Sequence, residues 1–149
     1  MKINIDVNES YKDLEVVVKT PKITNEVTSI LKKLKLQQQK NIIGNKNEKI
    51  YILNPKDILI FYTSSQKVLA DTLENSFEIK MKLYEIEELL KDTSFVRISK
   101  FSIVNVTKIK NIELSFNGYL IVNLINRKQE SISRRYTQKV KDFIKMGGY

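Results

Sequence analysis

The spacing of apolar residues changes along the chain, and this change limits the folds that are open to it. From residue 41 onward, apolar and polar residues alternate in short runs, and turn residues such as Asn117-Gly118 separate the runs. A period of two indicates β-strands with one buried face, and short, closely spaced runs are typical of antiparallel sheets. We predict strands at residues 41–45, 49–53, 58–63, 67–72, 75–80, 95–99, 109–114, 119–125 and 129–132.

Two segments within this β-rich region have helical spacing instead. Apolar residues three to four positions apart predict a short helix at 82–91 and a final helix at 134–146. Ser133 precedes the final helix and is its predicted N-cap. The predicted fold class is therefore mainly β with small helices, in the α+β class.

The first residues of the chain follow a mixed pattern. Apolar residues at 3–7 and 14–19 predict two strands, although the second run also fits a buried helix segment. Helical spacing then predicts a helix from 24 to 37, with Thr24 as its N-cap. The apolar stripe of this helix has to be covered, either by the local strands or by a second copy of the chain.

A polar run, Gln37-Gln38-Gln39-Lys40, follows this helix and is the predicted linker. It divides the chain into a short N-terminal α/β (β-α) extension at 1–40 and a larger domain at 41–149. We expect the extension to be a dimerisation or docking element. The pattern does not separate these two roles.

Cysteine and histidine are absent, which excludes several kinds of chemistry. Without them there is no thiolate or imidazole for a zinc site and no Cys–His nucleophile. The serines have no histidine to activate them, and the isolated glycines form no phosphate-binding loop. Glu85, Glu87 and Glu88 share one short amphipathic helix and fit a solvated helix face. We therefore expect no enzyme, and no catalytic residue, metal or cofactor.

The apolar runs are also informative about location. Even the longest, such as Ile58–Tyr62, fall far below the roughly 20 residues that span a bilayer. The alternating N-terminus is unlike a secretion signal. We expect a cytoplasmic protein.

Positive charge is concentrated near the end of the chain. The net charge is +9, from 26 basic and 17 acidic residues, and residues 93–149 alone contribute eleven basic and three acidic residues. All four arginines lie in this last part. Such asymmetry favours a polyanionic partner, with nucleic acid ahead of a membrane surface; a solvated basic face is the alternative.

Polar and basic residues gather at three places where predicted elements end. These are Thr63–Lys67, Arg97–Ser102 and Ser133–Arg135. Hydroxyl and amide groups donate to phosphates, and Arg or Lys can read guanine edges in a major groove. Arginines at the start of a helix conflict with the positive end of its dipole, and a bound anion would remove this conflict.

The sequence around these places resembles the LytTR-type DNA-binding domains. The resemblance rests on Phe95-Val96-Arg97-Ile98-Ser99-Lys100-Phe101-Ser102-Ile103-Val104-Asn105, on Ser115-Phe116-Asn117-Gly118 and on Ser133-Arg134-Arg135-Tyr136. The resemblance covers residues 41–146. Within this range, the upstream segments Ile60–Thr63 and Leu83–Leu90 fit the same family. It implies an elongated sandwich of small antiparallel sheets, in which loops rather than a recognition helix enter successive major grooves.

The resemblance also implies which residues contact DNA. Arg135 would read a base, Lys100 would occupy a base-contacting position, and Ser102 and Ser133 would anchor phosphates. The sequence departs from the family at Ser99, where many members have His, and at Phe101, where the usual Ser is displaced to the next position. The full expected set is Thr63, Ser65, Lys67, Arg97, Ser99, Lys100, Ser102, Ser133, Arg134 and Arg135.

These observations predict a sequence-specific transcriptional regulator that binds double-stranded DNA, as a homodimer at least on DNA. One alternative is a protein-interaction module that a membrane-bound inhibitory protein controls, because small relatives that resemble this chain are often paired with such a protein. Another is a protein that binds RNA or single strands through exposed aromatic residues.

Overall fold

A computed structural model describes residues 1–38 and 41–145 of the chain. The chain divides into two compact units, Met1–Gln39 and Lys40–Tyr149, and each is described by itself. The last two residues of the predicted linker, 39 and 40, lie outside the described residues. Of the described helices, none is long and apolar enough to cross a bilayer.

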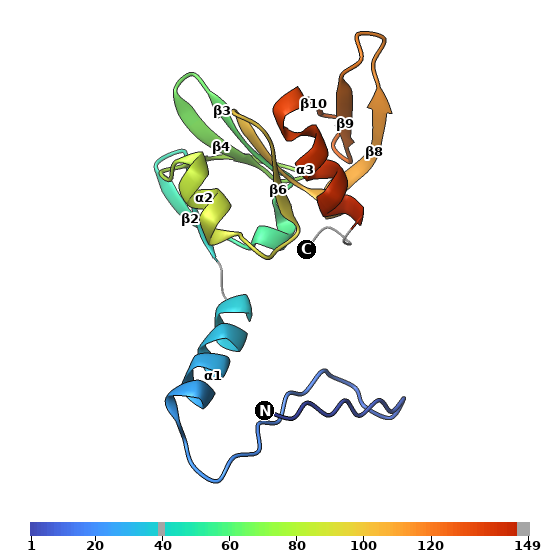
Figure 1. Cartoon of the computed structure of the whole chain (residues 1–149). Coiled ribbons are helices and arrows are strands. Elements are labelled where there is room, and N and C mark those ends of the chain that lie inside the picture. Colours follow the sequence, from blue (N-terminus) through green and yellow to red (C-terminus); the bar gives the residue numbers. More distant parts are fainter. Residues whose placement is uncertain (39–40, 146–149) are drawn as a thin grey trace. The chain divides into compact units, whose positions relative to one another are not determined.

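The larger unit is built on a seven-stranded antiparallel sheet with the strand order β2-β1-β5-β4-β3-β7-β6 (Figure 1). Its strands are β1 (Ile42–Lys46), β2 (Lys49–Leu53), β3 (Ile60–Ser64), β4 (Lys67–Asp71), β5 (Ser76–Ile79), β6 (Phe95–Ser99) and β7 (Ser102–Asn105). Two-residue turns join β1 to β2 and β3 to β4, and all four turn residues have positive φ. Turns of this kind match the twist of the strands that they connect.

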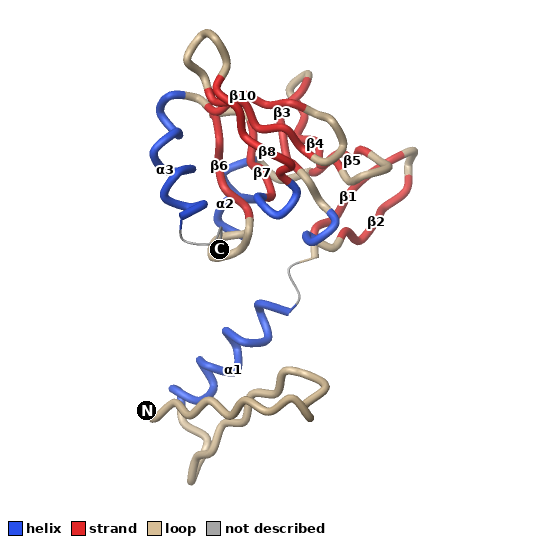
Figure 2. Tube along the Cα trace, turned by 90° about the vertical axis from the view of Figure 1, so that its right-hand side faces the viewer, coloured by secondary structure: helices blue, strands red, loops and turns tan. Residues whose placement is uncertain are grey.

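A second sheet and two helices complete this unit. The sheet has the order β10-β9-β8, with β8 at Ile109–Leu114, β9 at Leu120–Leu124 and β10 at Gln129–Ile132. The helices are α2 (Leu83–Leu89) and α3 (Arg134–Lys145), and α3 runs beside β6 (Figure 2). Single 3-10 turns at Pro55–Asp57 and Val106–Lys108 lead into strands.

Strands β3, β6 and β7 of the seven-stranded sheet are buried on both faces, and successive residues of these strands enter different cores. Phe61 and Ile103 belong to a core with α2, whereas Ile60 and Val104 belong to a core with the second sheet and α3. The central strands are therefore held from both sides. This rigid centre positions the loops at the ends of β3, β6 and β7.

The structure confirms the predicted fold class of mainly antiparallel sheets with small helices. Each strand predicted after residue 41 is present, with ends shifted by at most two residues. Strand β7 was not predicted, because its residues Ser102, Ile103, Val104 and Asn105 are all buried and show no alternation.

The smaller unit consists of α1 (Asn25–Gln38) and the segment before it. Thr24 caps α1 as predicted, since its hydroxyl accepts from the Val27 amide at 3.4 Å. The strands predicted at 3–7 and 14–19 are wrong for this structure, which has no helix or strand in residues 1–24 (Figure 2). A strand is defined by its hydrogen-bonded neighbour, and alternation alone does not supply one.

Candidate nucleic-acid interface

Three loops carry the side chains that the sequence suggested for DNA contacts. Loop 1 (Thr63–Lys67) turns from β3 into β4, loop 2 (Ser99–Ser102) turns from β6 into β7, and loop 3 (Ser133–Arg135) enters α3. In loop 1, Ser65 and Gln66 have φ values of 50° and 63°. Two consecutive residues with positive φ make a tight hairpin turn, so the exposed hydroxyls of this loop stand at a defined tip.

Backbone hydrogen bonds hold the three loops next to one another. The Thr63 amide donates to the Phe101 carbonyl at 3.0 Å, which joins loop 1 to loop 2. The Ser133 amide donates to the Ile98 carbonyl at 3.0 Å, which joins loop 3 to the end of β6. The loops therefore follow one another in the order 1, 2, 3 along the upper edge of the larger unit in Figure 1.

Arg97 is part of the expected contact set, but its guanidinium is used inside the protein. It donates to the carbonyls of Ser99 at 2.8 Å and Lys100 at 2.6 Å, and to Glu87 at 3.0 Å. Its side chain is only 12% exposed. Arg97 therefore fixes the shape of loop 2 from beneath.

The two serines of loop 2 also face inward. Ser102 is buried, and its hydroxyl lies 2.9 Å from that of Ser99. The Ser99 hydroxyl in turn accepts from the Phe101 amide at 3.0 Å. Like the hydrogen bonds of Arg97, these contacts stabilise the shape of loop 2. They also keep the Ser102 hydroxyl away from the surface.

Lys100 and Arg135, in contrast, are exposed. Among the described residues, neither side chain makes an ion pair with a carboxylate. Both cations are therefore available to an external anion. Lys100 stands at the tip of loop 2, whereas Arg135 lies in the first turn of α3.

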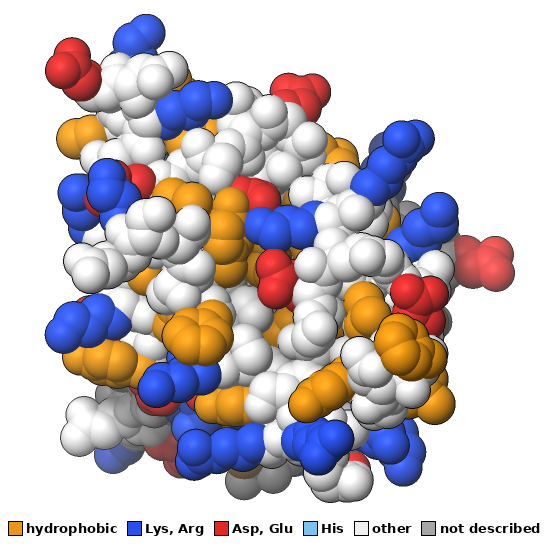
Figure 3. All heavy atoms as spheres, turned by 90° about the horizontal axis from the view of Figure 1, so that it is seen from above, with side chains coloured by type: hydrophobic (Ala, Val, Ile, Leu, Met, Phe, Trp, Pro, Cys, Tyr) orange, Lys and Arg blue, Asp and Glu red, His pale blue; other side chains and the backbone are white. Residues whose placement is uncertain are grey.

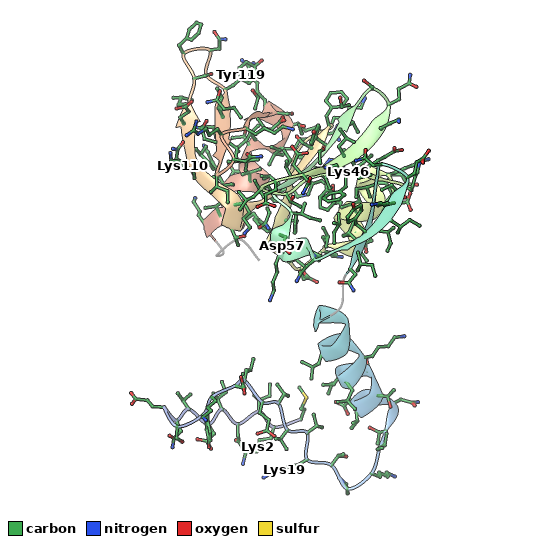
Figure 4. The ribbon with its side chains drawn as sticks, turned by 180° about the vertical axis from the view of Figure 1, so that it is seen from behind. Lys2, Lys19, Lys46, Asp57, Lys110 and Tyr119 are labelled. Carbon is green, nitrogen blue, oxygen red and sulfur yellow. The ribbon has the colours of Figure 1, made fainter. Side chains whose placement is uncertain are left out.

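Other residues of the expected set are exposed but make local contacts. Arg134 lies over the ring of Tyr119 at 5.0 Å, near the tip of the β8–β9 hairpin (Figure 4). Lys67 pairs with Glu78 at 3.5 Å. A hydrogen bond from Lys80 lowers the pKa of Glu78, and Lys67 contributes to this effect. Thr63 and Ser65 are exposed on loop 1, and Ser133 is half-buried at loop 3.

An open groove lies between loops 1 and 2 and the start of α2. Its polar lining includes Lys82 and Lys100, and its apolar lining includes Tyr84 and Phe101, which are 64% and 62% exposed. Lys82 and Tyr84 are not among the residues predicted from the sequence. Their place beside the loops depends on how α2 packs under the sheet, and no local pattern indicates it.

Charge around the loops is largely positive. Glu87 faces this region from α2, but it is met by Arg97 at 3.0 Å and by Lys139 of α3 at 3.6 Å. Seen from above, Lys and Arg side chains lie around much of the margin of this view, with Asp and Glu side chains among them and hydrophobic side chains between them (Figure 3). Such a surface attracts polyanions.

Comparison with known proteins identifies the family to which this arrangement belongs. The LytTr DNA-binding domain family matches residues 48–145, which is well over half of the chain. The chain belongs to the LytTR DNA-binding domain family. It is accordingly a DNA-binding transcriptional regulator rather than an enzyme, as the sequence analysis predicted.

Relatives and a solved structure agree with this assignment. The chain is 31% identical over 143 residues to an uncharacterized HTH-type transcriptional regulator of Staphylococcus aureus strain NCTC 8325, covering 95% of this chain and 97% of the relative. It is 30% identical to a counterpart from strain MRSA252 with the same coverage. The LytTr DNA-binding domain of a protein described as a methyl-accepting/DNA response regulator from Bacillus cereus has the same fold, with a TM-score of 0.67 at 20% identity over 71% of this chain and 97% of that one.

The described residues of this LytTR protein contain no helix-turn-helix, although the staphylococcal relatives carry that term in their descriptions. Strands follow α1 and α2, and strand β10 precedes α3. A helix-turn-helix needs two helices joined by a short turn. The described part of this unit therefore offers no recognition helix of the helix-turn-helix kind.

Proposed function

We propose that this LytTR protein reads double-stranded DNA through loops 1, 2 and 3, which enter successive major grooves along one side of the duplex. The observation that carries the proposal is the arrangement of the loops. Two backbone hydrogen bonds place them side by side in the order 1, 2, 3, and the exposed cations Lys100 and Arg135 lie on different loops. Contacts on one rigid edge can follow a duplex without a recognition helix.

The contacts of each side chain suggest different roles within the interface. Lys100 and Arg135 have no acidic partner among the described residues, so we assign base reading to them, with guanine as the base that Arg135 recognises best. Exposed or half-buried hydroxyls, and cations that already have local contacts, suit phosphates. This second group consists of Thr63, Ser65, Lys67, Ser133 and Arg134.

Three residues of the expected set receive a positioning role instead. Arg97, Ser99 and Ser102 are hydrogen-bonded to the protein, and Ser102 is buried. Their polar atoms are committed to the shape of loop 2. We therefore propose that they hold Lys100 at the tip of this loop and do not anchor phosphates.

The proposal extends to assembly and location. A regulator that reads two half-sites is expected to bind as a homodimer, since two-fold operators mirror protein symmetry. We also place the protein in the cytoplasm, where it can reach the chromosome. Control by a membrane-bound inhibitory protein stays a prediction.

The test is a binding titration of the full chain by fluorescence anisotropy, on a duplex selected from genomic fragments and on a random duplex. We expect tighter binding to the selected duplex, with an affinity that falls steeply as salt rises. Lys100→Ala should reduce the preference for the selected duplex, whereas the control Lys141→Ala, also exposed but on a later turn of α3, should not. Equal affinities for both duplexes would contradict the proposal.

A single-strand binding function is the second candidate, because Tyr84 and Phe101 expose aromatic rings in the groove between loops 1 and 2. Aromatic rings of this kind stack on unpaired bases. Competition by single-stranded DNA or RNA of the same sequence distinguishes the two functions. Release of the duplex by an excess of single strand would favour this second candidate over major-groove reading.

A further inference from the structure

The segment before α1 exposes an unusual amount of apolar surface. Ile3, Ile5 and Val7 are 74%, 84% and 87% exposed, and Leu14 is 96% exposed. Single exposed apolar residues are common, but an alternating row of them is not. A row with this spacing matches one face of a strand, and the segment would bury that face if it paired with a neighbour.

The backbone of this segment also has no strand partner within the part of the chain that the structure describes. The chain turns back at residues 8–11, where the Tyr11 amide donates to the Asn8 carbonyl at 3.1 Å. The Tyr11 hydroxyl donates to Asp6 at 2.9 Å, which holds the turn against residues 1–7. The hydrogen-bonding groups of an extended segment without a neighbour can accept another strand.

We propose that residues 1–7 of two copies of this chain pair antiparallel, with the two Asn4 residues opposite each other, and that this pairing makes the N-terminal unit a dimerisation element. In this register Ile3 of each copy lies opposite Ile5 of the other. Lys2 of each copy lies opposite Asp6 of the other. Directly opposed residues in an antiparallel pair share a face, so the isoleucines lie together on one face and the charges on the other.

The distribution of charge favours a second copy over an unrelated partner. Lys2 and Asp6 are equally far from Asn4 and have opposite charges, so the segment is complementary to itself. Only the register centred on Asn4 opposes these two charges, and the same register opposes Ile3 to Ile5. Opposite charges in directly opposed pairs stabilise a sheet, and like charges destabilise it.

The first experiment measures the mass of the full chain by light scattering after size-exclusion chromatography. We expect twice the chain mass of 17.4 kDa. Ile3→Asp should lower the dimer association constant roughly a hundredfold, because two buried isoleucines are lost in each dimer. Ile50→Asp is the matched control, since Ile50 is also 74% exposed but lies on β2 of the other unit, and it should leave the dimer intact.

A monomer at all concentrations would overturn the proposal, and so would equal effects of the two isoleucine substitutions. Circular dichroism of each variant checks that the β-rich unit is still folded. Because the mass is measured without DNA, this result is separate from the proposed function of the loops. A dimer that fails to bind DNA would contradict the function of the loops and leave the pairing standing. A DNA-binding chain that stays monomeric would contradict the pairing, and with it the proposed homodimer, but not DNA reading by the loops.

A second experiment tests the register with exchanged charges. Lys2→Asp and Asp6→Lys should each weaken self-association by roughly tenfold, because each homodimer then has two like-charge pairs. An equimolar mixture of the two variants should form heterodimers, because an acidic side chain of one variant then faces a basic side chain of the other at both charged pairs. A mixture that associates no better than either variant alone would overturn the register.

Discussion

Loops 2 and 3 lie beside each other, but the arginine that supports loop 2 and an arginine of loop 3 are used in opposite ways. Arg97 of β6, next to loop 2, donates to two backbone carbonyls of that loop and to Glu87, and its side chain is almost fully covered. In loop 3, Arg135 is exposed and has no carboxylate partner among the described residues. The comparison separates a side chain that builds the interface from one that is free to contact DNA.

Replacing Arg97 should have the largest effect on stability. Arg97→Ala leaves two carbonyls of loop 2 without a donor and removes the nearer of two cations from Glu87. We expect a loss of about 2–3 kcal/mol in the free energy of unfolding, measured by urea denaturation. Arg135→Ala is the control and should change that free energy by less than about 0.5 kcal/mol. Equal losses in the two variants would remove the distinction between the loops.

Replacing Arg135 should have the next largest effect, and on DNA binding instead. Arg135→Ala should cost roughly 1–3 kcal/mol on the selected duplex and relax the preference at one base position, because a bidentate base contact is lost. Binding to a set of duplexes with single base changes measures this. If the selected and random duplexes lose the same affinity, Arg135 contacts phosphate and does not read a base.

Lys139 should give the smallest effect. The Lys139 Nζ lies 3.6 Å from a carboxylate oxygen of Glu87, and its side chain is 53% exposed. Glu87 therefore partly cancels the contribution of Lys139 to the positive potential around the loops. Lys139→Ala should weaken DNA binding by a few tenths of a kcal/mol, to the same degree on every duplex. It should also reduce the slope of log affinity against log salt concentration by up to about one. A loss confined to the selected duplex would place Lys139 among the base-reading residues.

The sequence allowed most of the β-rich unit to be predicted, because its strands alternate and the fold then covers their apolar faces. The prediction failed where the polarity of the residues and their burial in the fold disagree. Ser102 and Asn105 are polar but buried in β7. The Asn105 side chain is hydrogen-bonded to Thr107 in the next turn and to Ser94 and Ile58, which are farther away in the sequence. The segment before α1 has the converse problem, since its alternation is clear but no strand of the described chain covers it.

The candidate site was predictable as three loops, but the role of each residue in it was not. Basic and hydroxyl residues mark loops 2 and 3 in the same way in the sequence. Burial separates Arg97 and Ser102 from Lys100 and Arg135, and burial depends on the packing of α2 and β7. Lys82 and Tyr84 join the groove only because α2 begins beside loop 2.

The most direct measurement of the central claim uses the absence of native cysteine. Single cysteines introduced as Gln66→Cys, Phe101→Cys and Arg134→Cys can each carry an iron-EDTA reagent that cuts nearby DNA. The account predicts cuts at three positions along the duplex in the order 66, 101, 134, and none from a control reagent at Lys49→Cys on β2. Cuts that coincide for the three loops, or equal cutting from the control position, would contradict it.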